Sequence, residues 1–402
     1  MKISLVVISK ACFEAVNRTV FRLLESQYGI QVHLIIPDRL EFSDGTRVAV
    51  DIPGETLQIS KLSLTSHHPR LQVFKGASSI VSKIKPTHIL VDNDPASLMS
   101  LRAAGWAKKL NSKLWVMTCE NLERNYLKEA LSAVISLKPE AFVGGLLNQV
   151  FSLLIKSSID QVFTISQDGT KSMEAFGLKG RITQIPLGFD TNIFFEQNPE
   201  IIGEKKQQLK LNQPVIAYFG RIVPEKGVDL LVRALAGLKE RQWQLLIDDF
   251  DGYRTPYMNE ILNLLKSSGV GDRTVFFKSD HNSIADYMNM ADFVVLPSIT
   301  TRKWKEQYGR VIPEAMACGK VVIASKSGTP PELIGDCGFL FPEGGIRELQ
   351  ALISKLLSMP NNDRLEIGSK ASFRAHSLLS ANKQADLFFH KLVDNKSQIK
   401  IN

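Results

Sequence analysis

Short runs of apolar residues alternate along the whole chain with longer segments whose apolar positions repeat at helical spacing. The runs are rich in Val, Ile and Leu and lack polar alternation, which is typical of parallel strands buried on both faces. In the first half the expected strands are residues 3–9, 32–37, 88–92, 114–118 and 161–165, and expected helices include 11–27 and 96–111. This order predicts an α/β fold with a parallel sheet.

The pattern pauses between about residues 187 and 214, and a second series of the same kind follows. Its expected strands are residues 215–219, 244–247, 274–278, 293–296 and 321–324, and its expected helices are 227–239, 258–268, 284–290, 310–317 and 347–357. We therefore expect two Rossmann-like domains, residues 1–198 and 199–381. They should face each other across a cleft, because open α/β sheets bind ligands at the carboxyl ends of their strands.

Composition narrows the class of protein. The length of 402 residues suits two cores, and 44% hydrophobic with 22% charged residues is a globular balance. A net charge of +8 suits anionic partners, but no arginine-rich run with interleaved aromatics is present, which disfavours nucleic acid. The four cysteines form no C-x-x-C pair, as expected for free thiols in a reducing compartment. The amino terminus is interpreted as a strand rather than a signal peptide, so we expect a cytoplasmic protein.

The longest uncharged stretch, residues 141–155, is shorter than the roughly 20 residues of a membrane-spanning helix. A helix packed against its neighbours is the favoured interpretation. A helix lying on a membrane surface is the alternative, and Lys138 and Lys156 flank the stretch as that alternative requires.

Two cations follow the first strand of the second series, in the segment YFGRIVPEKG. Gly220 turns the chain, and Arg221 and Lys226 lie in one loop before a helix. Cations at the carboxyl edge of a sheet, beside a helix amino end, suit a diphosphate. Two solvated loop charges are the alternative.

Two glutamates follow the strand at residues 293–296: Glu306 in a polar loop and Glu314 one turn into a helix. The amides of Gly309, Arg310 and Val311 open that helix, where they and the dipole can hold an anion. Glu306 would then face the group attached to the anion, and Glu314 would point to the other side, toward paired ribose hydroxyls. Two ordinary helix glutamates are the alternative.

Together these segments resemble the family four glycosyltransferases, which are retaining enzymes of the GT-B fold. That family pairs a G-R-x-x-x-x-K-G loop with two glutamates separated by seven residues and followed by A-M-A-x-G. The matching residues here are Gly220, Arg221, Lys226 and Gly227, then Glu306, Gly309, Glu314, Ala315, Met316, Ala317 and Gly319. The segment SGTPPELIGDCGFLFPEG, residues 327–344, resembles the next part of the donor domain.

The resemblance implies roles for these residues. Arg221 and Lys226 would hold the donor diphosphate, and the amides of Arg310 and Val311 would hold a phosphate. Glu306 would contact the transferred sugar, and Glu314 would hold the ribose. The substrate would be a nucleoside-diphosphate sugar, without a separate cofactor. A hexose-type sugar would pass to a saccharide or lipid-linked acceptor at the inner membrane face, in cell-surface polysaccharide or glycolipid synthesis. The carboxyl-terminal helix, about residues 382–402, would return to the first domain.

The first half resembles the family more loosely. The chain departs from the family pattern in three places, two in the first half and one in the second. Family members often carry a glycine pair after the first strand, where this chain has ISKACFEAVNR. A frequent histidine is replaced by Cys119, Glu120 and Asn121. Glu120 or Asn121 would meet the sugar instead, and a cap or loop role is the alternative. The usual glycine-rich loop after the second donor-domain strand reads DDFDGYR, which leaves base recognition open.

Two acidic pairs, Asp92 with Asp94 and Asp249 with Asp251, invite a metal interpretation. Short acidic pairs are common in loops at strand ends, and Arg221 and Lys226 can neutralise a diphosphate, so we expect no metal. Three other functions were weighed. A nicotinamide dehydrogenase would need a G-x-G-x-x-G loop, which is missing from both expected places. Sugar epimerases and phosphorylases share the fold, but the glutamate pair favours transfer. A catalytically degenerate nucleotide-sugar-binding protein is the remaining alternative.

Overall fold

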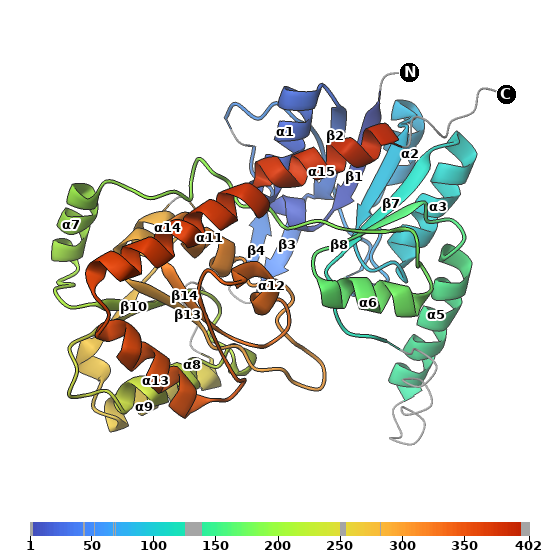
Figure 1. Cartoon of the computed structure of the whole chain (residues 1–402). Coiled ribbons are helices and arrows are strands. Elements are labelled where there is room, and N and C mark those ends of the chain that lie inside the picture. The colour runs from blue at the N-terminus through green and yellow to red at the C-terminus, as the bar shows by residue number, and fades with distance from the viewer. Residues whose placement is uncertain are drawn as a thin grey trace. The chain divides into compact units, whose positions relative to one another are not determined.

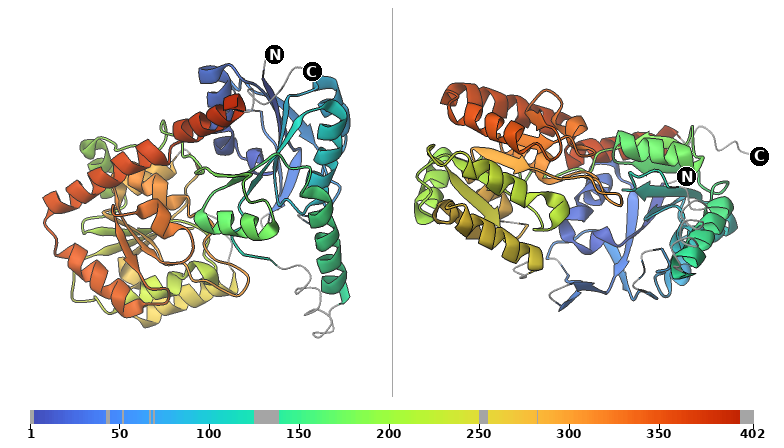
Figure 2. Two further views of the ribbon diagram at one scale, coloured as in Figure 1. Left: turned by 45° about the vertical axis from the view of Figure 1, so that its right-hand side comes forward. Right: turned by 90° about the horizontal axis from the view of Figure 1, so that it is seen from below.

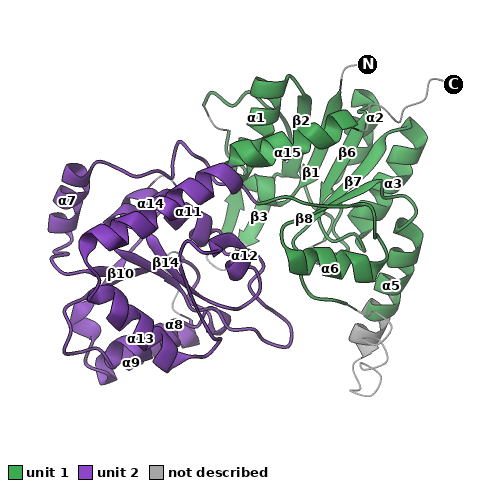
Figure 3. Cartoon of the chain, viewed as in Figure 1, with its two compact units in different colours: residues 1–186, 381–402 green, residues 187–380 purple. Residues whose placement is uncertain are grey.

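The structure is a computed structural model, which describes residues 3–42, 45–51, 53–66, 68, 70–124, 139–249, 255–281 and 283–394. Its contacts divide the chain into two compact units, residues 1–186 with 381–402 and residues 187–380 (Figure 3). We call them unit 1 and unit 2. Each unit is a parallel sheet with helices against it (Figures 1 and 2).

The sheet of unit 1 has the strand order β5-β2-β1-β6-β7-β8-β9, and all neighbouring strands are parallel. Its strands are β1 (Ser4–Ser9), β2 (Gln31–Pro37), β5 (Gln58–Leu62), β6 (His88–Asp92), β7 (Lys113–Thr118), β8 (Gln161–Thr164) and β9 (Ile182–Gln184). A separate antiparallel hairpin joins β3 (Arg39–Phe42) to β4 (Gly45–Val48). The central strands are the expected ones, whereas β5, β9 and the hairpin were not predicted, because they are short and only partly buried or polar.

The helices of unit 1 are α1 (Thr19–Tyr28), α2 (Ala77–Ile84), α3 (Leu98–Leu110), α5 (Pro139–Ile155), α6 (Gln167–Phe176) and α15 (Ala381–Asp394). Although α15 is last in the sequence, it lies beside α1 (Figure 1). The ring of Phe388 in α15 is 6.4 Å from that of Phe21 in α1 and 4.7 Å from that of Phe163 in β8. Burial of these rings binds the end of the chain to the core of unit 1.

The predicted helix at residues 11–27 is wrong over its first eight positions. Two 3-10 turns, η1 (Ala11–Phe13) and η2 (Ala15–Arg18), precede α1. The buried Arg18 guanidinium donates to the carbonyl oxygens of Cys12 and Phe13 at 2.8 and 2.9 Å. An α-helix would use those carbonyl groups for its own backbone hydrogen bonds. Because Arg18 occupies them, the segment forms a folded loop instead of a helix.

The sheet of unit 2 has the order β12-β11-β10-β13-β14-β15, again all parallel. Its strands are β10 (Val215–Tyr218), β11 (Gln244–Asp248), β12 (Thr274–Phe277), β13 (Phe293–Leu296), β14 (Val321–Ser325) and β15 (Phe339–Phe341). Its helices are α7 (Pro199–Gln208), α8 (Val228–Ala236), α9 (Pro256–Ser267), α10 (Ile284–Met290), α11 (Val311–Ala317), α12 (Pro330–Ile334), α13 (Ile346–Leu357) and α14 (Asn361–Leu378), with 3-10 turns η3 (Pro224–Lys226) and η4 (Gly271–Arg273). The expected strands of this half agree with the observed ones to within one residue, and β15 is additional.

The structure places the boundary between the units at residues 186 and 187 instead of 198 and 199. Residues that follow Pro186 pack within unit 2: the ring of Phe189 meets that of His376 at 5.4 Å, and the amide of Gln197 donates to Asn289 Oδ1 at 3.1 Å. The expected pause also contains α7. That helix buries only Ile202, so its sequence carries little of the apolar periodicity that predicts a helix.

Strand order reverses once in each sheet. In unit 1 the chain passes from β1 to β2 on one side and later fills the other side, starting with β6; in unit 2 the same reversal lies between β10 and β13. Ligands of open α/β sheets bind beyond the carboxyl ends of the strands at such switch points. The residues after β1, β6, β10 and β13 are therefore the first places to look for a site.

No helix among the described residues has both the length and the apolar character needed to cross a bilayer. The uncharged stretch at residues 141–155 lies in α5, which has 17 residues.

Candidate active site in unit 2

The loop after β10 carries two of the predicted cations. Tyr218, the last residue of β10, is buried, and its hydroxyl donates to the carbonyl oxygen of Arg221 at 2.7 Å. Burial, together with the nearby charge of Glu306, raises the pKa of Tyr218 well above its usual range, so the phenol stays a donor. The side chain of Arg221 is exposed, and none of the ion pairs among the described residues uses it. The loop thus presents Arg221 to solvent from a fixed backbone.

Lys226 ends the same loop, and Gly227 explains how closely the loop approaches β13. Gly227 has φ +65°, and a Cβ atom there would lie 2.1 Å from the carbonyl oxygen of Pro297, directly after β13. Only glycine permits both the backbone angle and the contact. The amide of Ile299 also donates to the carbonyl oxygen of Glu225 at 2.8 Å. These contacts press the two switch-point loops together.

Glu306 lies where the loops meet, and its side chain is buried. Its Oε2 atom accepts a hydrogen bond from Lys226 Nζ at 2.6 Å and another from Ser298 Oγ at 2.7 Å. Glu306 is 4% exposed, and the ammonium of Lys226 also lies 5.1 Å from the centre of the Trp304 ring. A charge-assisted pair with this little solvent is held in one geometry. Lys226 and Glu306, 80 positions apart in sequence, therefore form one unit.

A third loop, after β14, fixes the backbone around Glu306. Gly328 has φ +70°, and a Cβ there would lie 2.2 Å from the carbonyl oxygen of Glu306. That oxygen accepts from the amide of Thr329 at 3.3 Å, and the Thr329 hydroxyl donates to the carbonyl oxygen of Gln307 at 2.6 Å. The carboxyl ends of β10, β13 and β14, which are neighbours in the sheet, thus converge on one carboxylate.

The second glutamate, Glu314, lies in α11, which begins at Val311 with Arg310 as its preceding cap residue. Arg310 Nε donates to Glu314 Oε1 at 3.4 Å. Burial raises the pKa of Glu314 to about 6, and the charge of Arg310 opposes this shift. Gly309 stands before the helix, with its Cβ position 3.6 Å from Glu306 Cγ. The start of α11 is therefore adjacent to Glu306.

The two predicted sugar contacts in unit 1 have local partners. Glu120 Oε1 accepts from the amide of Leu122 at 3.1 Å, and Oε2 accepts from Arg124 Nε at 2.9 Å. Asn121 is buried, at 3% exposed. The contacts of Glu120 suit the loop role that is its alternative.

Of the two acidic pairs, only Asp92 with Asp94 lies wholly within the described residues, and its two carboxylates have separate partners. Asp92 Oδ2 accepts from Ser9 Oγ at 2.6 Å, whereas Asp94 Oδ2 pairs with Arg70 at 2.7 Å. Asp249 follows β11, and Asp251 lies outside the described residues, as does most of the DDFDGYR loop. No group of three potential ligands for a metal ion occurs within the described part of the chain.

Sequence reasoning missed several residues that shape the site. Ser298, Tyr218 and Thr329 position Glu306 or Arg221, yet a serine after a strand or a tyrosine within one has no distinguishing sequence signal. Tyr308, two positions after Glu306, is buried at 3% exposed. Trp304 is the aromatic residue that reaches Lys226.

Two parallel α/β units with a reversal in each sheet define the GT-B fold class, and solved structures share it. The chain matches a glycosyltransferase from Rickettsia africae over 98% of its length and 99% of that chain, with a TM-score of 0.75 and 17% identity. It matches Anabaena Alr3699/HepE, solved in complex with UDP, over 98% of its length and 100% of that chain, with a TM-score of 0.72 and 21% identity. At these identities the likeness establishes the fold.

A family model matches most of the second unit. Residues 201–372 match the family model described as glycosyl transferases group 1. The GDP-mannose-dependent alpha-(1-6)-phosphatidylinositol monomannoside mannosyltransferase of Mycolicibacterium smegmatis is 29% identical over 46% of this chain and 50% of its own length. The D-inositol 3-phosphate glycosyltransferase of Actinosynnema mirum is 34% identical over 39% of this chain and 38% of its own length. The chain spans about half, or less, of the length of these curated relatives.

Proposed function

We propose that the protein is a retaining glycosyltransferase. It moves a hexose-type sugar from a nucleoside-diphosphate sugar to a saccharide or lipid-linked acceptor, in the synthesis of cell-surface polysaccharide or glycolipid. The observation that carries the proposal is the buried Glu306–Lys226 pair at the switch point of unit 2, with Glu314 on the helix that starts beside it. The match to the group 1 glycosyl transferase model, which spans all three residues, supports it.

In this proposal the cations act on the leaving group. Arg221 and Lys226 neutralise the diphosphate as its charge grows, which is the largest contribution that a preorganised site makes to such a reaction. Amides of Arg310 and Val311, at the start of α11, add donors for a phosphate. Lys226 is held by Glu306 at 2.6 Å before substrate arrives, so its ammonium needs little reorganisation. These groups neutralise the diphosphate without a metal ion.

The glutamates act on the two ends of the donor. Glu306 orients the sugar and keeps Lys226 in place, while Glu314 accepts from the ribose hydroxyls. The acceptor hydroxyl attacks from the face that the nucleotide leaves, and an oxygen of the departing phosphate takes its proton. The chemistry is therefore mainly positioning and electrostatic stabilisation.

Printed names of relatives support the substrate classes. One relative is GDP-mannose-dependent, and the Anabaena structure holds UDP, so nucleoside diphosphates are the common element. Relatives named for phosphatidylinositol mannoside and lipopolysaccharide favour a saccharide or lipid-linked acceptor.

Contact with the inner face of the cytoplasmic membrane is part of the proposal. Leu146, Val150, Leu153 and Leu154 are exposed and recur along α5 at helical spacing. The neighbouring helix α3 exposes Arg102, Lys108 and Lys109. Exposed apolar residues on one helix and exposed cations on a helix packed against it suit the surface of an anionic membrane. Lys156 lies at the end of α5, with its ammonium over the Phe176 ring, and Lys138 is outside the described residues.

The proposal is tested with the full chain and a panel of nucleotide sugars, with glycosides or water as acceptor. Release of nucleoside diphosphate is measured for wild type, Glu306→Gln and Glu366→Gln. We expect turnover with one donor series and a loss of about 100-fold or more in Glu306→Gln, the usual effect of removing one electrostatic contact at a reacting centre. Glu366 is an exposed glutamate in α14, so its substitution should leave turnover unchanged.

The anomeric coupling constant of the product, measured by proton NMR, reports the stereochemistry. Product with the donor's configuration is expected, and an inverted product would refute the retaining mechanism. Turnover of Glu306→Gln equal to that of wild type, or no turnover from folded protein with any donor, would refute the proposed function.

A further inference from the structure

The switch point of unit 1 carries a carboxylate that the proposed donor chemistry does not use. Ser9 ends β1 and Asp92 ends β6, and the two residues are paired in register at the carboxyl edge of the sheet. This is the position in unit 1 that corresponds to the β10–β13 edge of unit 2. A ligand of unit 1 would bind beyond this edge.

Hydrogen bonds hold the Ser9–Asp92 pair in one geometry, and they use only one of the two carboxylate oxygens of Asp92. Ser9 Oγ donates to Asp92 Oδ2 at 2.6 Å and accepts from the amide of Cys12 at 3.1 Å. Ser9 is fully buried, so its hydroxyl is satisfied. Asp92 is only partly buried, and no partner of its Oδ1 atom occurs among the described residues. That oxygen can accept a hydrogen bond from a ligand.

The chemistry of Asp92 favours a neutral donor. None of the ion pairs among the described residues includes Asp92, and burial raises the pKa of its carboxyl group. Its neighbour Asp94 is engaged differently: Oδ2 pairs with Arg70 at 2.7 Å, and Oδ1 accepts from the amide of Ala96 at 2.8 Å. A phosphate would be repelled by Asp92. A sugar hydroxyl would supply the missing donor without adding charge.

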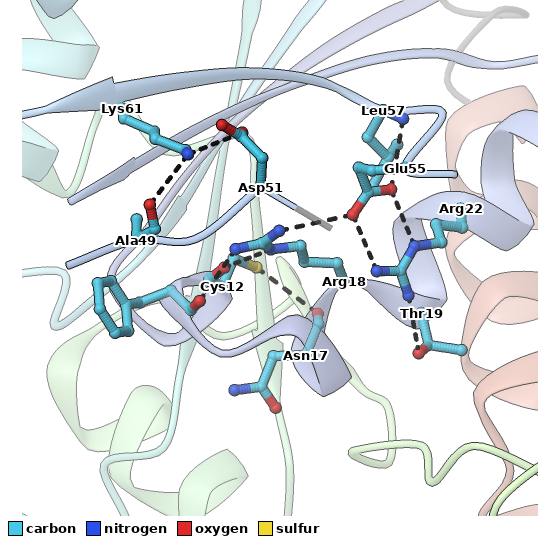
Figure 4. A network of polar contacts seen from close by, with 11 residues as sticks. Cys12, Asn17, Arg18, Thr19, Arg22, Ala49, Asp51, Glu55, Leu57 and Lys61 are labelled. Carbon is cyan, nitrogen blue, oxygen red and sulfur yellow. Dashed lines mark hydrogen bonds and ion pairs between the residues drawn. The ribbon is translucent and has the colours of Figure 1, made fainter. Parts of the chain in front are cut away.

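A network of polar contacts centred on Arg18 holds the loop after β1 (Figure 4). The buried Arg18 bonds to the carbonyl oxygens of Cys12 and Phe13 and lies 3.5 Å from Glu55 Oε2. Glu55 in turn accepts two hydrogen bonds from Arg22, at 2.9 and 2.8 Å. This Arg18 network fixes the backbone that carries Cys12, whose amide orients Ser9. Preorganisation of this kind lowers the cost of binding a ligand.

We propose that Asp92 binds a hydroxyl group of the acceptor saccharide in unit 1, with Ser9 as its positioning residue. The proposal rests on the proposed function, because it assigns the acceptor to this unit. Unit 2 also has a serine that donates to a carboxylate at its switch point, although there Ser298 and Glu306 both lie in the loop after β13. Two serine–carboxylate pairs, one at each switch point, would then hold hydroxyl groups of the two reacting sugars.

The test uses methyl α-glucoside, methyl α-mannoside and myo-inositol as probes, with the full chain. Saturation-transfer NMR titrations measure their dissociation constants for wild type, Asp92→Asn and Asp160→Asn. Asp160 precedes β8 at the opposite edge of the same sheet, where it bonds to Lys113 and Leu114. We expect at least one probe to bind wild type and Asp160→Asn equally, and Asp92→Asn about tenfold more weakly, the effect of one hydrogen bond to a charged group.

Ser9→Ala provides a second variant. It keeps the carboxylate of Asp92 but removes its support, so it should weaken the same probe less than Asp92→Asn does, and it decides the question if Asp92→Asn does not fold. Equal affinity of wild type and Asp92→Asn, or no probe bound by wild type, overturns the proposal. A nucleoside-diphosphate thermal shift on the same samples separates this outcome from failure of the proposed function, because that shift depends on unit 2.

Discussion

At the scale of single residues, Glu314 has the most unusual environment in the candidate site. It is 7% exposed, and its pKa is raised to about 6 by burial, with Arg310 as the opposing charge. A carboxylate in this position costs folding free energy at neutral pH unless a ligand supplies hydrogen-bond donors. We interpret the cost as part of the preparation for ribose hydroxyls.

This environment makes a signed prediction about stability. The folded pKa of Glu314, about 6, exceeds the unfolded value of 4.5. The folded state therefore binds more protons between these values, and the free energy of unfolding falls as pH rises through that window. The Glu314→Gln variant does not lose this free energy of unfolding, because its amide does not ionise. The difference in unfolding free energy between Glu314→Gln and wild type should grow by about 1–2 kcal/mol in favour of the variant from pH 4.5 to pH 8.

Urea denaturation of unit 2 at both pH values measures the difference, with the exposed Glu366→Gln as the control for removing a charge. A difference that stays constant with pH, or that grows toward acid, would show that Glu314 is not buried in the way described.

Arg221, Lys226, Glu306 and Glu314 were assigned to the candidate site from the sequence because they stand at recognisable spacings, and their roles stay predictions. The contact between Lys226 and Glu306 could not be predicted from the spacing, because it joins residues of two loops that are 80 positions apart in the sequence. Ser298 and Arg18 were missed for a related reason. Each acts through the backbone or through another side chain, so its role exists only in the folded chain.

At the scale of elements, the loops after neighbouring strands form the site, and glycines determine how closely they approach. The strands of unit 2 were predictable because buried apolar runs are bounded by turns. The segment at residues 11–18 was not, because its helical pattern is overridden by the buried Arg18.

Substitution of Gly227 by alanine tests the close approach, with Gly344→Ala as a matched control. Gly227 and Gly344 have φ +65° and +72°, but a Cβ at Gly344 meets nothing within 4 Å, whereas at Gly227 it would lie 2.1 Å from Pro297 O. Gly344→Ala should lower the free energy of unfolding by about 1–2 kcal/mol, the cost of a left-handed alanine. Gly227→Ala should lower it by at least about 1 kcal/mol more, through overpacking.

Only Gly227→Ala should also weaken nucleotide binding, since it alone displaces Lys226 from Glu306. Calorimetric titration of the two variants with the nucleotide preferred by wild type measures this effect. Equal stability and equal affinity of the two variants would contradict the role given to the contact.

At the scale of the whole molecule, the fold repeats one principle in two units. Each unit has a parallel sheet with one reversal, and each places a serine-supported carboxylate at that reversal. The sequence supported two Rossmann-like domains but placed their boundary too late. Residues 187–198 carry no periodic pattern, and only their packing against residues such as Asn289 and His376 assigns them to unit 2.

The central claim is that unit 2 binds the nucleoside diphosphate half of a sugar donor. A thermal-shift panel of UDP, GDP, dTDP, ADP and their sugars on wild type, Glu314→Ala and Glu366→Ala tests it most directly. A ligand at about 100 times its dissociation constant adds roughly 2.7 kcal/mol to the free energy of unfolding. The account predicts that one nucleotide series stabilises wild type and Glu366→Ala but not Glu314→Ala. Folded wild type that is stabilised by none of these ligands would contradict it.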